Sequence, residues 1–417
     1  MATSAYAELL ARLLPARRFG IVLGLERMRA LLDRLGAPDR ALGTIVHVGG
    51  TNGKGSTVAM IAALARAAGK RVATYTSPHL TSLRERIVID GALVSEEAIV
   101  AAADRVSAAG GDELTFFEQV TAIAFVAIAA ANVEITVVEV GLGGRLDATN
   151  VVDAPVAVVT GVALDHEAIL GPTLEAIAGE KAGIWKRGQD AIIGASGEPA
   201  AVQVLVDAAR SVAARVTVID AAAIEAVPRV GLPGAHQRRN AAAALAVIER
   251  LSISLDAHTR ERALATVRHP GRFELFVHGG VRFILDGAHN PHGALALAEA
   301  LRERDERPLL IVAVSADKEV AKIAAALAPV TSEVIATRYQ QERSLEPAQL
   351  AAVFGALGVP ATAAPDLASA LELARARVTT AVLIAGSLFL VGEARTLLVG
   401  APTDPVRVSD PSSPPPG

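Results

Sequence analysis

Short, β-branched apolar runs alternate with longer alanine-rich stretches of helical periodicity along most of this chain. The short runs suit buried strands, and the stretches between them are long enough for helices. Strands that alternate with helices predict right-handed βαβ units around a mostly parallel sheet, which restricts the fold to the α/β class. The elements predicted for the first part of the chain are the strands Thr44–Val48, Arg71–Tyr75, Glu134–Val140, Val156–Thr160 and Ala191–Gly194 and the helices Ser56–Ala68, Thr173–Trp185 and Glu198–Ala214.

The same pattern restarts after a predicted hairpin. Gly279 and Gly280 separate the apolar runs Phe273–Val277 and Val281–Leu285, and paired glycines suit a tight turn between strands. Beyond the hairpin we expect the helices His292–Arg304 and Val320–Leu327 and the strands Leu309–Val314, Glu333–Ala336 and Ala381–Ala385. Since one domain holds about 100–200 residues, we predict a larger sheet domain over 1–272 and a smaller C-terminal α/β domain over 273–402. The segment 403–417 is rich in proline and serine, which predicts disorder.

Composition narrows the class of protein. The 40 basic and 44 acidic residues leave no basic surplus, which argues against a nucleic-acid partner. Cysteine is absent, so disulfides, thiolate zinc sites and cysteine nucleophiles are excluded. The best candidate for a membrane span, the uncharged run between Glu118 and Glu134, is shorter than the roughly 20 residues that a span needs. Charged residues also interrupt the N-terminus where a signal peptide would be apolar. We therefore expect a cytoplasmic protein without a membrane or nucleic-acid partner.

A glycine-rich loop directly follows the first predicted strand. Residues 49–57 read Gly-Gly-Thr-Asn-Gly-Lys-Gly-Ser-Thr and lead into a helix. Glycines let backbone N–H groups approach phosphate oxygens, and the helix N-terminus favours negative charge. Lys54 is expected to reach the β- and γ-phosphates of a nucleotide, although Gly55 stands where the common phosphate loop has a hydroxyl residue. The alternative is an ordinary glycine-rich turn between a strand and a helix.

Charged residues follow two further predicted strands. Glu139 ends one strand and is followed by a glycine-rich loop up to Asp147, and Asp165 and His166 follow the next strand. Ligands of open α/β sheets bind beyond the carboxyl ends of the strands, where carboxylates and an imidazole could hold a divalent metal. Each residue taken singly is better explained as a hydrogen-bonded loop or strand-end residue, but their joint position favours a metal site.

Lys181 lies in the predicted helix Thr173–Trp185 among apolar neighbours. A lysine that is buried loses its proton more easily, and its neutral amine can capture CO₂ to form an anionic carbamate. From the surrounding sequence alone, an ordinary solvated helix lysine is the favoured interpretation.

Six motifs occur in an order that resembles one family, the bifunctional dihydrofolate synthase/folylpolyglutamate synthases of the Mur ligase superfamily. The resemblance spans roughly residues 23 to 389, and its most specific part is the unbroken string Glu139–Asn150. The displaced Gly55 also fits, because this superfamily carries that variant of the phosphate loop. The six motifs are residues 50–56, 77–80, 139–150, 180–184, 270–274 and 286–292.

This resemblance implies a role for particular residues. It implies ATP bound by Thr51, Asn52, Gly53, Lys54, Gly55 and Ser56, with Asn240, Arg272 and Asp286 as further nucleotide contacts. It implies two Mg²⁺ ions, one held by Ser77 and Glu139 and the other by His166 and a carbamylated Lys181. It implies an acceptor site built from Leu23, Gly24, Thr115, Phe116, Phe117, Glu118, Leu146, Asp147 and Ala148. His289 and Ser387 would receive glutamate, and Lys54, Lys181 and His289 would act in catalysis.

The implied activity is an ATP-dependent ligation of L-glutamate to dihydropteroate, to reduced folates, or to both, through an acyl phosphate. The expected partners are these small molecules alone, and the enzyme is expected to act as a monomer. Two alternatives stay open: another Mur-type amino-acid ligase that acts on a cell-wall precursor, and a non-catalytic phosphate-loop protein that switches a partner. The second alternative predicts no ADP release that depends on an amino acid.

Overall fold

The computed structural model describes residues 4–20, 22–341, 343–377 and 381–408, and it divides into two compact units. The first unit consists of the described parts of 1–230, 238–267 and 404–417. The second consists of the described parts of 231–237 and 268–403. The chain therefore leaves the first unit and returns to it at its end.

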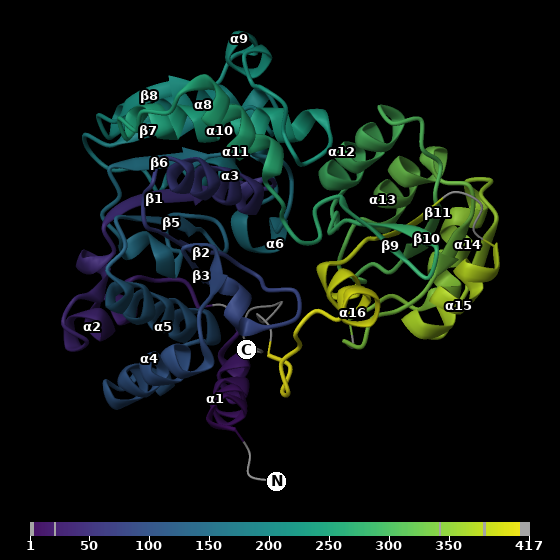
Figure 1. Ribbon diagram of the computed structural model, residues 1–417, viewed down its shortest axis with the longest axis horizontal. Helices are drawn as coiled ribbons and strands as arrows, with labels where there is room; N and C mark the ends of the chain where they lie inside the picture. Colours follow the sequence, from purple (N-terminus) through teal and green to yellow (C-terminus); the bar gives the residue numbers. More distant parts are fainter. Residues whose placement is uncertain (1–3, 21, 342, 378–380, 409–417) are drawn as a thin grey trace. The chain divides into compact units, whose positions relative to one another are not determined.

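The first unit is built on an eight-stranded sheet in the order β4-β3-β2-β5-β1-β6-β7-β8 (Figure 1). The strand pairs from β2 to β8 are parallel, and β3 and β4 are antiparallel additions at one edge. The mostly parallel sheet confirms the fold class expected from the sequence. The strands are β1 (Thr44–Gly49), β2 (Val72–Tyr75), β3 (Ile87–Ile89), β4 (Ala92–Leu93), β5 (Ile135–Glu139), β6 (Val156–Val159), β7 (Asp190–Ile193) and β8 (Arg215–Val218).

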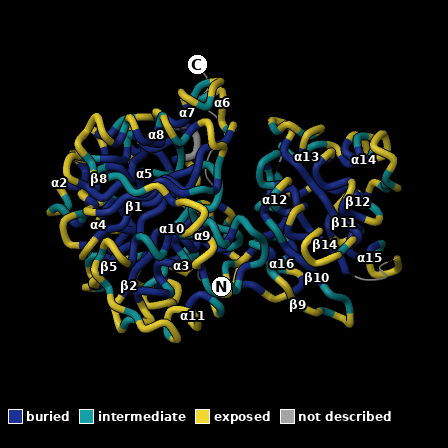
Figure 2. The backbone as a smooth tube through the Cα atoms, turned by 90° about the horizontal axis from the view of Figure 1, so that it is seen from above, coloured by how far each residue is buried: buried dark blue, intermediate teal, exposed yellow. Residues whose placement is uncertain are grey.

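Helices cover this sheet on both sides and bury its apolar strands (Figure 2). One core cluster joins α1, α2, α4 and α5 to the strands near β2, and another joins α7 and α8 to β6 and β7. Within the described residues, no helix combines the length and the apolar character that a membrane crossing requires. The helices are α1 (Ala5–Leu13), α2 (Glu26–Arg34), α3 (Lys54–Ala67), α4 (Glu96–Ala108), α5 (Phe116–Ala131), α6 (Glu167–Leu170), α7 (Leu174–Ala182), α8 (Ala200–Ser211), α9 (Ala221–Glu225), α10 (Ala235–Arg250) and α11 (Ala257–Thr266). Short 3₁₀ turns are η1 (Leu14–Phe19), η2 (Pro38–Ala41), η3 (Leu83–Arg86), η4 (Gly111–Glu113) and η5 (Ala148–Val151).

The second unit contains a six-stranded sheet in the order β13-β12-β11-β14-β10-β9. The predicted hairpin is present, because β9 and β10 pair antiparallel around Gly279 and Gly280, which have φ angles of 58° and 78°. The other pairs of this sheet are parallel, so the smaller α/β unit also agrees with the sequence. The strands are β9 (Glu274–His278), β10 (Val281–Leu285), β11 (Leu309–Val312), β12 (Val334–Ala336), β13 (Ala361–Ala363) and β14 (Val382–Ala385). The helices are α12 (Pro291–Arg302), α13 (Val320–Leu327), α14 (Pro347–Ala356), α15 (Leu367–Arg377) and α16 (Leu388–Val399), with a 3₁₀ turn η6 (Ala328–Val330).

The C-terminal segment differs from the sequence prediction of disorder over 403–417. Residues 404–408, which we call the C-terminal strap, are ordered against the first unit. The buried Asp404 carboxylate accepts hydrogen bonds from the Tyr6 hydroxyl at 2.8 Å and from the Leu83 N–H at 2.7 Å. Val408 belongs to the main core cluster, and its carbonyl contacts a ring nitrogen of His79 at 2.8 Å. A segment rich in proline and serine is disordered only where it has no surface to pack against, and the first unit provides such a surface for residues 404–408. Residues 409–417 lie outside the described part of the chain.

Candidate active site

The glycine-rich loop lies between the end of β1 and the start of α3, with the geometry of a phosphate cradle. Gly50 and Gly53 have φ angles of 138° and 85°, and a Cβ on Gly50 would lie 2.0 Å from the Thr160 hydroxyl. A Cβ on Gly53 would lie 2.4 Å from the side-chain oxygen of Asn240. Only glycine satisfies both the backbone angles and the close approach at these positions. The expected ATP-binding residues Thr51 to Ser56 therefore occupy a strand–loop–helix turn.

Residues that follow β6 hold this loop in place. The Thr51 N–H donates to the Gly161 carbonyl at 2.9 Å, and the Thr160 hydroxyl donates to the Asn52 carbonyl at 2.7 Å. Asn240, an expected nucleotide contact, is buried and accepts a hydrogen bond from the Ser196 hydroxyl at 2.8 Å. The loop is thus fixed by contacts to its own unit, which preorganises its N–H groups for an anion.

Two lysine ammonium groups meet at one carbonyl of this loop. Nζ of Lys54 donates to the Gly50 carbonyl at 3.2 Å and to the Thr51 carbonyl at 3.2 Å. Nζ of Lys181, which comes from α7, donates to the same Gly50 carbonyl, also at 3.2 Å. The structure therefore joins two expected catalytic residues that lie far apart in the sequence.

Lys181 is only 4% exposed, so the interpretation as a solvated helix lysine is wrong. Burial, together with the positive charge of Lys54, lowers the pKa of Lys181 to about 7, against the opposing effects of Asp165 and Asp147. A much larger fraction of this amine is neutral at pH 7 than of an ordinary lysine. The sequence interpretation failed because the contact that Lys181 makes, with the Gly50 carbonyl, joins residues 131 positions apart.

Glu139 and Ser77 lie next to each other at the carboxyl ends of β5 and β2. Glu139 is the last residue of β5 and is 5% exposed, and its Oε2 accepts the Ser77 N–H at 3.2 Å. A buried carboxylate beside a hydroxyl residue fits a hard divalent cation, which prefers oxygen ligands. The structure thus brings together the pair for which the first Mg²⁺ is expected, while their role as ligands stays a prediction.

Asp165 and His166 follow β6 and precede α6. The His166 backbone has a φ of 54°, its N–H donates to Oδ1 of Asp165 at 2.9 Å, and its side chain is 45% exposed. In the ranges that the structure describes, no three His, Cys, Asp or Glu side chains form a ready metal cluster. The second expected metal set, His166 with Lys181, therefore stays a prediction.

The expected acceptor residues Thr115 to Glu118 form the first turn of α5. Thr115 and Glu118 make a capping box, in which Oε2 of Glu118 accepts the Thr115 N–H at 2.9 Å and the Thr115 hydroxyl at 2.7 Å. Arg27 of α2 also donates to this Oε2 at 2.8 Å. Oε1 of Glu118 is buried without a hydrogen-bond partner. This free oxygen is the atom of the turn best suited to bind a polar ligand.

The apolar acceptor residues differ in their position: Leu23 lies on the segment before α2, and Phe116 and Phe117 lie in the first turn of α5. Leu23 is exposed, and Gly24 precedes α2. Phe116 is fully buried beneath the Arg86 guanidinium, and a Cβ on Gly141 would lie 2.4 Å from the Phe117 ring.

Asp147 is buried between the two ends of the loop that carries Leu146 and Ala148. Its Oδ2 accepts the Leu142 N–H at 2.8 Å, and its Oδ1 accepts the Thr149 N–H at 3.0 Å. Burial raises the pKa of Asp147, and these hydrogen bonds oppose that rise. The carboxylate thus holds the loop that carries its two neighbours.

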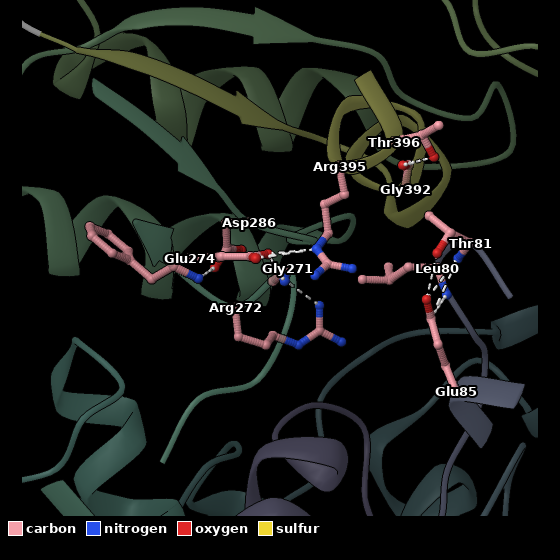
Figure 3. Close-up of polar contacts among 11 residues, drawn as sticks. Leu80, Thr81, Glu85, Gly271, Arg272, Glu274, Asp286, Gly392, Arg395 and Thr396 are labelled. Atoms are coloured by element: carbon pink, nitrogen blue, oxygen red, sulfur yellow. Dashed lines mark hydrogen bonds and ion pairs between the residues drawn. The ribbon is translucent and has the colours of Figure 1, made fainter. Parts of the chain in front are cut away.

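In the second unit, Asp286 follows β10 and Arg272 precedes β9. Asp286 accepts the Phe273 N–H at 2.8 Å and the Ala288 N–H at 2.9 Å. Arg272 donates to the Gly271 carbonyl at 3.2 Å (Figure 3). Desolvation raises the pKa of Asp286, and the positive charge of Arg272 opposes this. Glu274 binds the Gly271 N–H at 2.8 Å and Nε of Arg395 at 2.9 Å (Figure 3).

The two residues expected to receive glutamate follow neighbouring strands of the second sheet. His289 comes after β10, and its Nδ1 lies 2.7 Å from the Gly287 carbonyl. Ser387 comes after β14 and caps α16, with its hydroxyl accepting the Phe389 N–H at 3.1 Å. Because β10 and β14 are parallel neighbours, both residues lie at the carboxyl edge of the sheet, where ligands bind.

The sequence interpretation missed Arg27 and Thr160. Arg27 contacts Glu118 across a separation of 91 residues, which no local pattern reveals. Thr160 carried a signal, because it is a polar residue at the end of an apolar strand, where functional groups gather.

Comparison with known proteins identifies relatives along most of the chain. Residues 48–248 match the Mur ligase middle domain, and residues 271–388 match the Mur ligase glutamate ligase domain. The dihydrofolate synthase/folylpolyglutamate synthase of Mycobacterium tuberculosis is 38% identical over 89% of this chain and 89% of its own length. A probable bifunctional folylpolyglutamate synthase/dihydropteroate synthase of Haloferax volcanii is 36% identical over 94% of this chain, and the chain spans about half (50%) of that relative.

Solved structures agree with this assignment. The Mycobacterium tuberculosis folylpolyglutamate synthase complexed with ADP has a TM-score of 0.86 at 36% identity, over 94% of this chain and 98% of that one. FolC of Escherichia coli in complex with DHPP and ADP has a TM-score of 0.85 at 32% identity, over 95% of this chain and 99% of that one.

The fold of both units and the variant phosphate loop thus define a ligase of the Mur type. Within that superfamily, the chain belongs to the dihydrofolate synthase/folylpolyglutamate synthases. The family and the enzyme class expected from the motifs are both confirmed.

Proposed function

We propose that this protein joins L-glutamate to dihydropteroate, to reduced folates, or to both, with ATP as the energy source. The choice between the two acceptors stays open. Among its relatives, one solved structure carries DHPP with ADP, and a bifunctional folylpolyglutamate synthase/dihydrofolate synthase carries Mn, AMPPNP and L-glutamate. These ligands support the expected use of ATP and a divalent metal here.

The observation that carries the proposal is the pair of lysines at the phosphate loop. Lys54 and Lys181 both donate to the Gly50 carbonyl, while Glu139 ends the β-strand next to β1. A loop of this shape binds the phosphates of a nucleotide, and a neighbouring carboxylate suits the metal that accompanies them. A glycine-rich turn without a ligand does not explain why two cations converge on one backbone oxygen.

Each residue has a distinct task in the proposed reaction. The loop N–H groups and Lys54 bind the β- and γ-phosphates and stabilise the charge that develops as the γ-phosphoryl group moves to the acceptor carboxylate. When bound, Mg²⁺ neutralises phosphate charge and polarises the transferring group. Ser77 and Glu139 would hold one ion, and His166 with carbamylated Lys181 would hold the other. The amine of glutamate, held by His289 and Ser387, then attacks the acyl phosphate, and phosphate leaves.

Carbamylation of Lys181 is part of this proposal. The amine is 4% exposed and lies among positive charge and phosphate-binding groups. A carbamate replaces a cation with an anionic oxygen ligand, which fits a site that must hold a second positive ion. The sequence-based expectations of a monomeric, cytoplasmic enzyme that acts on small molecules alone also belong to the proposal, as do the residue ranges predicted for the two domains.

The test is a ligation assay with the purified full chain. We expect ADP to form only when MgATP, L-glutamate and a pteroate-type acceptor are present together, because the acyl phosphate forms on the acceptor and glutamate consumes it. Dihydropteroate and tetrahydrofolate are offered in separate reactions, and the product mass shows which of them gains glutamate. Ligation of a cell-wall nucleotide precursor, with neither of these acceptors used, would move the protein to another Mur-type activity.

Lys54→Ala tests the phosphate loop, and Lys70→Ala is its matched control. Lys54→Ala removes a cation that acts on the transferring phosphate, so turnover should fall at least roughly a hundredfold, the scale of one lost transition-state donor. The fold should survive, since the loop geometry depends on its glycines. Lys70→Ala, which removes a half-exposed lysine paired with Glu134, should keep normal turnover. Normal ADP formation by folded Lys54→Ala protein would contradict the phosphate-loop assignment.

A further inference from the structure

His47 is a fully buried imidazole in the central strand of the first sheet. It lies in β1 between Val138 of β5 and Ala157 of β6, and its exposure is 0%. Its flanking strands are apolar, so a polar ring here costs free energy unless it is hydrogen-bonded. No step of the proposed reaction uses this residue.

One nitrogen of the ring has a partner, and that partner leads to the acceptor loop. Nε2 of His47 lies 2.9 Å from the Thr149 hydroxyl oxygen. The Thr149 hydroxyl donates in turn to Oδ1 of Asp147 at 2.5 Å. Three buried side chains thus form a continuous chain of hydrogen bonds from the central strand to the acceptor loop.

The Asp147 carboxylate fixes which atom donates in each of these hydrogen bonds, because a carboxylate can only accept. Thr149 has one hydroxyl proton, which goes to the Asp147 carboxylate, so its oxygen must accept from Nε2–H of His47. Nδ1 of His47 is buried without a hydrogen-bond partner, as expected for the unprotonated nitrogen of a neutral ring. Burial and the nearby Lys186 lower the pKa of His47 to about 3, which keeps the ring neutral.

Asp147 closes the loop by binding N–H groups at both of its ends. It accepts from Leu142 at the start of the loop and from Thr149 at its close. Between them lie Leu146 and Ala148, which are expected to contact the acceptor. The orientation of this carboxylate therefore determines the position of the loop.

We propose that His47 is a positioning residue, which fixes the acceptor loop relative to the phosphate loop through the Thr149 hydroxyl and Asp147. The strand that carries His47 ends at Gly49, one residue before the carbonyl that binds both lysines. The same strand thus supports the nucleotide site at its end and the acceptor site through a side chain. Reacting groups must be held at about 3–3.5 Å, so a small shift of one loop against the other lowers the rate. This inference rests on the proposed function, in which 146–148 bind a pteroate-type acceptor.

The test uses four variants of the full chain. His47→Leu removes the Nε2 donor, and His47→Gln restores an N–H near the same place. Thr149→Val removes the relaying hydroxyl with little change of volume, and the fourth variant combines His47→Leu with Thr149→Val. For each, we measure the KM for the acceptor, the KM for ATP, and the affinity for ADP.

We expect His47→Leu and Thr149→Val each to raise the acceptor KM about tenfold, the effect of one lost hydrogen bond to a charged network. The KM for ATP and the affinity for ADP should change less than about twofold, a difference too small to reflect a lost hydrogen bond. The double variant should be no worse than the worse single variant, because both act through one chain. His47→Gln should recover most of the acceptor KM.

Other results would overturn the inference. If His47 merely fills the core, the KM for ATP and the KM for the acceptor should rise equally. The fold-changes of the two single variants should then multiply in the double variant, and His47→Gln should restore nothing. If the unmodified protein ligates neither acceptor, the proposed function fails instead. In that case, denaturant unfolding of the same four variants still decides whether His47 and Thr149 act as one unit. Non-additive changes of the unfolding midpoint in the double variant would support the hydrogen-bonded pair, and additive changes would contradict it.

Discussion

Two ammonium groups that share the Gly50 carbonyl repel each other at short range. The effect is visible at Lys181, where Lys54 is the main charge that lowers the pKa. A buried pair of like charges is costly, and the cost disappears if one group loses its proton or becomes a carbamate. Burial and Lys54 therefore favour the neutral form of Lys181 more strongly than solvent does.

Lys181→Arg provides a direct test of this point. Arginine keeps a positive charge that it cannot lose, so we expect turnover to fall at least roughly a hundredfold, as when one transition-state contact is removed. Lys181→Ala should also be nearly inactive, but added acetate should restore part of its activity, since a short carboxylate can supply the anionic oxygen. The readout is ADP formation with glutamate and acceptor present. Full activity of Lys181→Arg would mean that no anionic ligand is needed.

At this scale, the sequence predicted the strand–loop–helix geometry of residues 49–57 well and the environment of Lys181 poorly. The loop residues are contiguous, and their glycines carry a backbone requirement that is visible in the sequence. The side chain of Lys181 donates to the carbonyl of Gly50, which lies 131 residues away, so no local pattern reveals this contact. The partner of Glu118, Arg27, was missed for the same reason, because its contact depends on the packing of α2 near α5.

The α5 helix shows how a single element positions candidate site residues. Its capping box fixes the first turn, and most of the helix is buried. Thr115 and Glu118 thus cap the start of the helix, and the same two residues are expected to contact the acceptor. Arg27 neutralises the buried carboxylate from α2, which links the segment after Gly24 to the same turn.

Thr115→Ala should destabilise the first unit by about 1–2 kcal/mol, the usual cost of losing a side-chain N-cap. It removes the hydroxyl that binds the Glu118 backbone N–H and carboxylate. Thr115→Ser keeps that hydroxyl and should have nearly the original stability. Denaturant unfolding of both variants checks this, and equal midpoints for Thr115→Ala and the unmodified chain would show that the cap contributes nothing.

Elements with strong apolar character were predictable, and short edge elements were not. Buried strands such as β1, β5 and β6 have continuous apolar runs, so they appear in the sequence within a residue or two of their observed ends. The strands β3, β4 and β13 are two or three residues long, which is too short for any periodicity to show. Their positions depend on neighbouring strands that supply the hydrogen bonds.

For the whole molecule, the C-terminal strap makes the first unit discontinuous in sequence. Asp404 contacts Tyr6 and Leu83, which lie near the other end of the chain. Burial raises the pKa of Asp404, and its hydrogen bonds oppose that rise. The proline and serine content of this segment could not predict this arrangement, because composition does not show which surface of the first unit the segment packs against.

A chain that ends after Thr403 should be less stable by about 2–4 kcal/mol, since it loses two buried hydrogen bonds and the burial of one valine side chain. The measurement is the denaturant midpoint of the first unit. A chain that ends after Val408 keeps every contact described here, so the difference between the two truncations belongs to residues 404–408. An unchanged midpoint for the shorter chain would show that the strap is dispensable.

The strap also has a consequence for the order of synthesis. A ribosome makes residues 4–267 first, then the whole second unit, and only then the residues that complete the core around Tyr6 and Leu83. During translation, the nascent first unit must therefore remain without the Asp404 contacts to the Tyr6 hydroxyl and the Leu83 N–H until residue 404 has been made. For protein engineering, this means that a gene fragment cut at the apparent boundary after residue 267 encodes an incomplete unit, and that a fusion partner joined close to Val408 is placed beside a packed core.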